Sequence, residues 1–171
     1  MRILSASPIL LSPGKGIPNN PDLPLLLYRQ VFRAGDNLEH QFKEAFRENS
    51  WAGTWTNGVF GYHHYHSVAH EVLGVAAGAA TLIFGGPGGQ EVEVTAGDMV
   101  VLPAGTGHCC KQASSNFRVI GAYPQGQEDY DICKETDDVA EKVKNIAKVA
   151  LPLADPVAGR HGPLLQHWRQ Q

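Results

Sequence analysis

Four side chains with metal-binding chemistry stand out by their spacing: His64, His66, Glu71 and His108. The first three belong to the pattern Gly58-x5-His64-x-His66-x4-Glu71-x6-Gly78. The fourth belongs to the pattern Gly97-x5-Pro103-x-Gly105-x2-His108-x3-Gln112. Three imidazoles and one carboxylate suit borderline divalent ions such as Fe, Mn, Ni, Cu, Zn or Co. On a five- or six-coordinate ion, four protein ligands leave one or two positions open, and a catalytic metal needs an open position.

Short strands separated by turns could bring these donors together. Residues i and i+2 of a strand point to the same face, so His64 and His66 should project together. Glu71 opens the next strand, and His108 follows a tight turn at Pro103–Gly105. If the sheet closes on itself, the four donors from three strands converge in the interior. The spacing therefore predicts one divalent metal ion per chain.

Strand alternation also predicts a substrate pocket beside the metal. Phe60 and Tyr62 share the face of His64, and Cys110 and Gln112 share the face of His108. We predict that these four residues line the pocket and that Tyr62 is catalytic, donating a hydrogen bond to the substrate there. The alternative for Phe60 and Cys110 is that both are ordinary core residues. Glu71 is predicted to be catalytic as well as a ligand, as the base that accepts a substrate proton.

Two further histidines border the pattern. His63 has the opposite parity to His64 and His66, which predicts a surface or sheet-packing residue. His70 adjoins Glu71 and is predicted to face outward as well. If the turn at 67–70 is irregular, His70 could replace Glu71 as a ligand, and this alternative stays open.

Length and composition favour a single domain in 171 residues, with no bilayer-spanning apolar run. A net charge of −3 gives no electrostatic reason to bind nucleic acid or an anionic membrane. The N-terminal apolar patch is interrupted by Pro8 and Pro13, which is unlike a signal peptide. Three cysteines, an odd number with two adjacent, do not form a disulfide framework. We therefore expect a cytoplasmic protein.

The chain divides into four segments of this one domain. Residues 1–36 are expected to form an extended arm that ends in a strand over 25–32. A helix over 37–50 has an apolar stripe of Leu38, Phe42 and Phe46. Residues 51–127 contain many short β-like runs and glycine turns, which favour a mainly β sandwich or barrel. Residues 128–171 are expected to form a helix over 137–150, capped by Thr136, and an extended tail. The helix should bury Val139, Val143, Ile146 and Ala150.

The two spaced patterns resemble the two motifs of the cupin superfamily, G-x5-H-x-H-x3,4-E-x6-G and G-x5-P-x-G-x2-H-x3-N. Every fixed position matches except the last, where Gln112 replaces Asn. The resemblance covers about residues 58–112 and implies a double-stranded β-helix, or jelly-roll, barrel. It also implies that His64, His66, Glu71 and His108 are the metal ligands.

A narrower resemblance links the chain to small bacterial cupins of the YjlB type, which are described as related to quercetin dioxygenase. It is carried by these segments: PNNPDLPLLLYRQVF, HYHSVAHEVLGVAAG, VLPAGTGHC, GAYPQG and ADPVAG…GPLLQHW. Small cupins that resemble this chain commonly dimerise, often by exchanging an N-terminal strand, and segment 25–32 suits that role. The resemblance thus implies a homodimer.

Three functions remain open at this point. The first is a metal-dependent dioxygenase acting on a small enol, phenol or diketone, since few basic residues lie near the motifs to hold a phosphate. The second is an isomerase or lyase in which the metal stabilises an enolate. The third is a non-catalytic module that binds a small molecule or a metal. Fe, Ni or Cu in the purified protein would favour the first, and Zn or Mn the other two.

Overall fold

The computed structural model describes residues 4–35 and 37–169; residues 1–3, 36, 170 and 171 of the predicted arm and tail lie outside that range. The strands are β1 (Ser7–Ile9), β2 (Leu25–Tyr28), β3 (Trp51–Asn57), β4 (His64–Tyr65), β5 (Glu71–Ala77), β6 (Ala79–Phe84), β7 (Gln90–Thr95), β8 (Met99–Leu102), β9 (His108–Ala113), β10 (Arg118–Pro124) and β11 (Cys133–Lys134). The helices are α1 (Leu38–Glu48), α2 (Val139–Lys148) and α3 (Pro163–His167).

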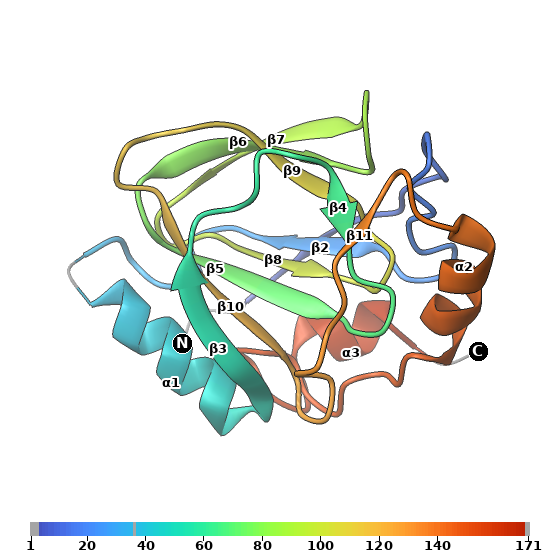
Figure 1. Ribbon diagram of the computed structural model, residues 1–171. Coiled ribbons are helices and arrows are strands. Elements are labelled where there is room, and N and C mark those ends of the chain that lie inside the picture. Colours follow the sequence, from blue (N-terminus) through green and yellow to red (C-terminus); the bar gives the residue numbers. More distant parts are fainter. Residues whose placement is uncertain (1–3, 36, 170–171) are drawn as a thin grey trace.

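The strands form two antiparallel sheets that face each other (Figure 1). One sheet has the order β1-β2-β8-β5-β10-β3, and the other has the order β11-β4-β9-β6-β7. Alternating side chains from both sheets meet between them and form an apolar cluster. It consists of Leu25, Leu27, Leu73, Val75, Ala80, Leu82, Phe84, Val92, Val94, Val100, Leu102 and Val119. The predicted mainly β, jelly-roll class is confirmed.

Helix α1 covers the outer face of the six-stranded sheet (Figure 1). Leu38, Phe42 and Phe46 recur along one side of the helix and are all buried, which confirms the predicted stripe. They join a second apolar cluster that includes Val72 of β5 and, from the C-terminal tail, Trp168. The six-stranded sheet is therefore packed on both faces, and β5, which carries Glu71, lies near its centre.

Helix α2 differs from its prediction in length and burial. Asp138, not Thr136, caps its start, because the Asp138 side chain accepts a hydrogen bond from the Ala140 amide. Of its predicted buried stripe only Ile146 is buried, and Val143 is 46% exposed. The reason is that α2 lies beside β11 at the edge of the molecule instead of on a sheet face (Figure 1).

The N-terminal arm folds onto the turn that precedes His108. The Asn19 side chain donates to the Gly85 carbonyl and accepts from the Gly107 amide, and Asn20 donates to the Ala104 carbonyl. The strand predicted over 25–32 is limited to β2, which pairs with β1 and β8. Exchange of this segment between two chains stays a prediction, and a monomeric mass in light scattering would rule it out.

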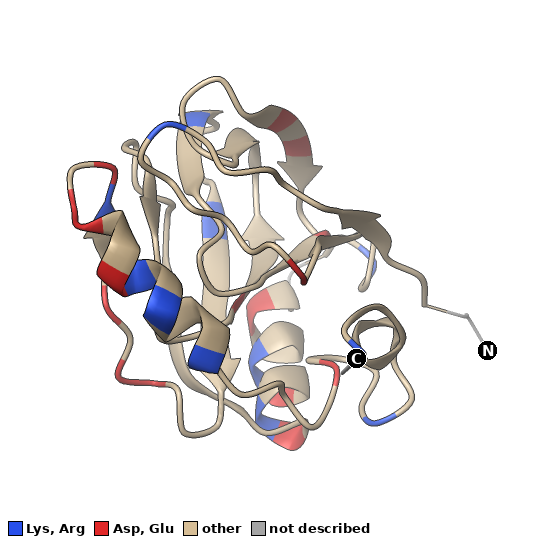
Figure 2. Cartoon of the chain, turned by 90° about the vertical axis from the view of Figure 1, so that its right-hand side faces the viewer, with Lys and Arg blue, Asp and Glu red and all other residues tan. Residues whose placement is uncertain are grey.

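Two surface properties bear on possible partners. Within residues 4–35 and 37–169, no helix has the length and apolar character that crossing a bilayer requires. The face shown in Figure 2 carries charges of both signs, and α2 alone contributes Glu141 beside Lys142, Lys144 and Lys148. This face therefore offers no broad field of one sign.

Candidate metal centre

Three buried histidines meet between the two sheets. His64 of β4 and His108 of β9 are register partners on neighbouring strands, and their ring centroids lie 4.0 Å apart. His66 follows β4 directly, and one nitrogen from each of the three rings lies within 4.8 Å of the others. Strand pairing thus brings two rings together, and the i, i+2 spacing adds the third.

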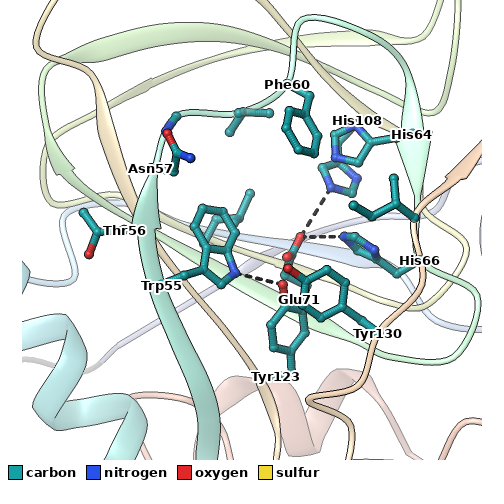
Figure 3. A pocket seen from close by; sticks show the side chains of 14 residues that line it. Trp55, Thr56, Asn57, Phe60, His64, His66, Glu71, His108, Tyr123 and Tyr130 are labelled. Atoms are coloured by element: carbon teal, nitrogen blue, oxygen red, sulfur yellow. Dashed lines mark hydrogen bonds and ion pairs between the residues drawn. The ribbon is translucent and has the colours of Figure 1, made fainter.

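Glu71 reaches the same point from the opposite sheet (Figure 3). Its Oε1 lies 3.4 Å from Nε2 of His66 and 3.3 Å from Nε2 of His108. Burial raises the pKa of this carboxyl, but the neighbouring His66 and His108 outweigh burial and hold it well below its usual range. The structure therefore brings all four predicted ligands together, with Glu71 as a carboxylate.

The outer nitrogen of each imidazole is held by a backbone carbonyl. Nδ1 of His64 lies 3.0 Å from the Tyr62 oxygen, and Nδ1 of His108 lies 3.0 Å from the Thr106 oxygen. Nδ1 of His66 contacts the Asp131 oxygen. Because a carbonyl can only accept, each Nδ1 carries the proton in the neutral ring, and each Nε2 keeps its lone pair. Three lone pairs and a carboxylate without a donor among them fit a bound cation.

His64 and His66 differ in how readily they bind a second proton. Burial, followed by the charge of neighbouring His108, lowers the pKa of His64 to about 3, so this ring is neutral near pH 7. Burial also lowers the pKa of His66, but the Glu71 carboxylate outweighs it and the net shift is upward. A proton on Nε2 of His66 would therefore occupy the place that a metal ion competes for.

A strap of residues 129–134 crosses the mouth of the site and is fastened through Asp131. Besides its backbone contact to His66, Asp131 accepts hydrogen bonds from the Ser67 amide, at 2.7 Å, and from the Ser67 hydroxyl. The Cys133 thiol donates to the same carboxylate at 3.1 Å. Asp131 thus fixes both the imidazole of His66 and the strap. It lies outside the motifs, and no signal in the sequence marks it.

A cavity of about 220 Å³ opens beside the four ligands (Figure 3). Its lining consists of Trp55, Thr56, Asn57, Gly58, Val59, Phe60, His64, His66, Glu71, Leu73, His108, Tyr123, Tyr130 and Ile132. None of these residues is a lysine or an arginine, and Glu71 is the one acidic residue among them. The cavity wall is therefore mainly aromatic and apolar, and the four ligands form one polar side of it, with Thr56 and Asn57 on another.

Two aromatic residues missed by the sequence analysis lie next to Glu71. Tyr123 of β10 stacks on Tyr130 of the strap, with ring centroids 4.4 Å apart, and its hydroxyl accepts a hydrogen bond from Nε1 of Trp55 at 2.8 Å. Burial, followed by the charge of Glu71, raises the pKa of Tyr123 far above its usual value. Tyr123 and Tyr130 both follow the second motif, and Trp55 precedes the first, so motif spacing could not identify them.

Of the predicted pocket residues on the first motif, Phe60 lines the cavity and Tyr62 does not. Tyr62 is 41% exposed and stacks on the outer side of Phe60, with centroids 4.9 Å apart. Residues 58–63 are not a strand, because β3 ends at Asn57 and β4 begins at His64, so strict alternation does not apply to them. Tyr62 therefore lies at the rim, and a hydrogen bond from it requires a substrate that reaches the rim.

The pocket prediction for Cys110 and Gln112 is wrong. Cys110 pairs with Leu82 and packs against the apolar cluster between the sheets. Gln112 pairs with Thr81, is exposed and lines a different surface hollow. The register shifts between Thr81 and Leu82, so one extra residue of β9 forms a β-bulge and reverses the alternation beyond Cys110.

The two bordering histidines lie outside the cluster. His63 is partly exposed, which fits the predicted surface or sheet-packing position. His70 is 1% exposed. The prediction that its side chain faces outward, into solvent, is therefore wrong. Its Nδ1 accepts a hydrogen bond from the Ala104 amide at 2.9 Å, and its ring packs on Trp168. The C-terminal tail therefore covers His70, and Glu71, not His70, faces the histidine cluster. Burial lowers the pKa of His70 to about 4.

Two solved structures are distantly similar to this chain. RmlC from Streptococcus suis in complex with dTDP-D-xylose matches at 14% identity and a TM-score of 0.41, over 72% of this chain and 71% of that one. Acireductone dioxygenase from Bacillus anthracis with a cadmium ion in its active centre matches at 14% identity and a TM-score of 0.39, over 53% of this chain and 61% of that one.

Sequence comparison gives a closer relationship. Residues 54–120 match the family model described as "Cupin domain". The chain is 40% identical over 153 residues to "Uncharacterized protein YjlB" of Bacillus subtilis (strain 168), a match that spans 89% of this chain and 90% of that protein. Together with the two-sheet fold, this similarity over nearly the whole length shows that the chain belongs to the cupin superfamily.

Proposed function

We propose that the protein binds one divalent transition metal per chain through His64, His66, Glu71 and His108 and acts as a dioxygenase-type enzyme. The observation that carries the proposal is the convergence of three imidazole Nε2 lone pairs and one carboxylate beside a cavity. A redox-active ion held there would supply a Lewis acid for a substrate oxygen and the means to use O2. Fe, Ni, Cu, Mn, Zn and Co are all compatible with these ligands.

The cavity favours a small, planar and mainly apolar substrate. An apolar cavity of about 150 Å³ accepts benzene, so about 220 Å³ accommodates one ring with short substituents. The aromatic side chains of Trp55, Phe60 and Tyr130 can contact the faces or edges of such a ring. Since no lysine or arginine lines the cavity, a phosphorylated substrate would lack a cationic partner. We therefore propose a small enol, phenol or diketone.

In the proposed reaction, O2 oxidises the substrate, both oxygen atoms enter the products and a carbon–carbon bond breaks, so no external reductant is needed. Glu71 is the carboxylate that borders the cavity. Because its pKa lies well below the usual range, it would accept the proton of an enol or phenol only if a bound metal ion made that hydroxyl strongly acidic. The stacked side chains of Tyr123 and Tyr130 exclude water from this carboxylate. The three free thiols fit the reducing cytoplasm, which is the compartment we propose.

Elemental analysis followed by oxygen uptake tests this function. The purified protein, and protein reconstituted with each of the six metals, would be assayed with single-ring enols, phenols and diketones, using His66→Ala as the control. Uptake with at least one metal that His66→Ala lacks supports the proposal, and its absence with every metal contradicts it. Zn or Mn in the purified protein, with no oxygen uptake, would favour the isomerase, lyase or binding functions.

A further inference from the structure

We propose that Tyr123 is the positioning residue for Glu71, holding its carboxylate so that one oxygen faces the histidine cluster and the other is turned away. This inference rests on the proposed metal site. The same atom, Oε1 of Glu71, approaches Nε2 of both His66 and His108, at 3.4 and 3.3 Å. A carboxylate can rotate between binding a metal through one oxygen or two, so something must select the one-oxygen orientation.

The hydrogen bonds of Tyr123 have a fixed direction. The indole Nε1 of Trp55 can only donate, so at 2.8 Å the Tyr123 oxygen must be the acceptor. The Tyr123 proton then points elsewhere, and Figure 3 shows the Glu71 carboxylate and the stacked Tyr130 ring beside the Tyr123 side chain. A carboxylate is the stronger acceptor because it is charged. In the proposed arrangement Trp55 donates to Tyr123, and Tyr123 donates in turn to the Glu71 carboxylate, which lies next to it in Figure 3.

Two backbone features build this hydrogen-bond chain. Gly121 and Trp55 are register partners on β10 and β3, and a Cβ added to Gly121 would lie 2.2 Å from Cε2 and 2.5 Å from Nε1 of the indole. Only glycine lets the indole lie across β10 at this place. The β10–β3 register then shifts between Gly121 and Tyr123, and a β-bulge of this kind changes the direction of the side chains beyond it. Both features serve the contact between Trp55 and Tyr123.

The consequence concerns the number of open metal positions. If the second oxygen of Glu71 is held by Tyr123, Glu71 provides one ligand atom, and four protein atoms leave room for substrate on a five- or six-coordinate ion. If that oxygen is released, it can take a coordination position that a substrate needs. Hydrogen-bond partners of ligands commonly change metal affinity by about 10- to 100-fold when they are removed.

The test uses Co²⁺ as a spectroscopic probe, with Tyr123→Phe as the variant and Tyr130→Phe as the matched control. Both remove one hydroxyl from the same stacked pair. We expect Tyr123→Phe to bind Co²⁺ about 10-fold more weakly, by competition with a chelator, and to change the visible absorption bands that report coordination number. Tyr130→Phe should stay within about twofold of the wild type. Trp55→Phe should act in the same direction, and the double variant Trp55→Phe/Tyr123→Phe should be no weaker than Tyr123→Phe alone.

A measurement without metal tests the hydrogen bond itself. The indole N–H resonance of Trp55, assigned by its loss in Trp55→Phe, should move in Tyr123→Phe and stay in place in Tyr130→Phe. An unchanged cobalt spectrum and affinity in folded Tyr123→Phe would overturn the positioning role while leaving the metal site intact. An equal effect of Tyr130→Phe would overturn it as well. A wild-type protein that binds no Co²⁺ would remove the metal site and, with it, this role.

Discussion

The two ends of the space between the sheets differ in chemistry although the same strands build both. On β5, Glu71 belongs to the ligand cluster, whereas Leu73, two residues further along the same face, lies in the apolar cluster. On β9, His108 belongs to the ligand cluster, whereas Cys110 packs against the apolar cluster. Residues i and i+2 of a strand are about 7 Å apart. The surroundings of the side chains therefore change from polar to apolar within two residues.

This difference shows how a buried group of metal-binding side chains can be accommodated between two sheets. The apolar end contributes burial and rigid packing, which stabilise the strands. The ligand end leaves three Nε2 atoms and a carboxylate facing one another, and it depends on carbonyls such as those of Tyr62 and Thr106 to orient the rings. Substitutions at the two ends should therefore have separable effects, on metal binding at one and on stability at the other.

The largest expected effect is the loss of metal binding in His108→Ala. Removing one of three converging imidazoles should weaken binding of a divalent ion by more than about 100-fold, since changes to partners of a ligand alone reach that size. Metal content after reconstitution, measured by elemental analysis, gives the result. His63→Ala is the matched control, because His63 lies outside the cluster, and it should keep full metal content. Normal metal uptake by His108→Ala would show that the cluster is not the metal site.

The next largest effect is expected at the apolar end, in Leu82→Ala. Leu82 is 1% exposed and lies in the apolar cluster, so truncation leaves a cavity and should lower the free energy of unfolding by about 2–5 kcal/mol. Urea unfolding in the presence of a chelator measures this loss without any contribution from bound metal. The folded variant should still bind metal. If it lost metal as completely as His108→Ala, the two ends would not be independent.

The sequence could predict the four converging residues because their spacing follows local rules. His64 and His66 are two residues apart, and the turn at Pro103–Gly105 returns the chain so that His108 pairs with His64. Helix α1 could be predicted for a similar reason, since the spacing of Leu38, Phe42 and Phe46 depends on helix geometry alone. In each case, the relevant contact follows from positions close in sequence or from a motif.

Sequence patterns misplaced or missed residues where the tertiary structure overrides the alternation of side chains along a strand. A β-bulge in β9 turned Gln112 to the outer surface, and the irregular stretch before β4 moved Tyr62 to the rim. Tyr123 and Asp131 reach the site only because β10 and the strap fold back over it, which no local pattern specifies. Burial of His70 similarly depends on Trp168 of the distant tail.

His70 provides a test of polar burial outside the ligand cluster. Its folded pKa of about 4 lies below the value of about 6.5 in an unfolded chain, so stability is fully present above pH 6.5 and is lost as the pH falls toward 4. Between pH 7 and pH 5 the expected loss is about 2 kcal/mol. His70→Asn keeps an acceptor for the Ala104 amide but cannot titrate in this range, so its free energy of unfolding should depend less on pH. Equal pH dependence in both proteins, measured by urea unfolding, would show that His70 does not cause it.

The smallest effect is expected for Cys110→Ser. This variant tests where the boundary between the ligand end and the apolar end lies. Serine is close to cysteine in size, but its hydroxyl requires a hydrogen bond, and Leu82 opposite Cys110 offers none. Because Cys110 is only partly buried, the free energy of unfolding should fall by about 1 kcal/mol, and metal affinity should stay within about twofold. If Cys110 instead faced the cavity, a hydroxyl there would alter metal or substrate binding and leave stability nearly unchanged. That result would place the boundary beyond Cys110, whereas the expected one places it between His108 and Cys110, two positions along a single strand.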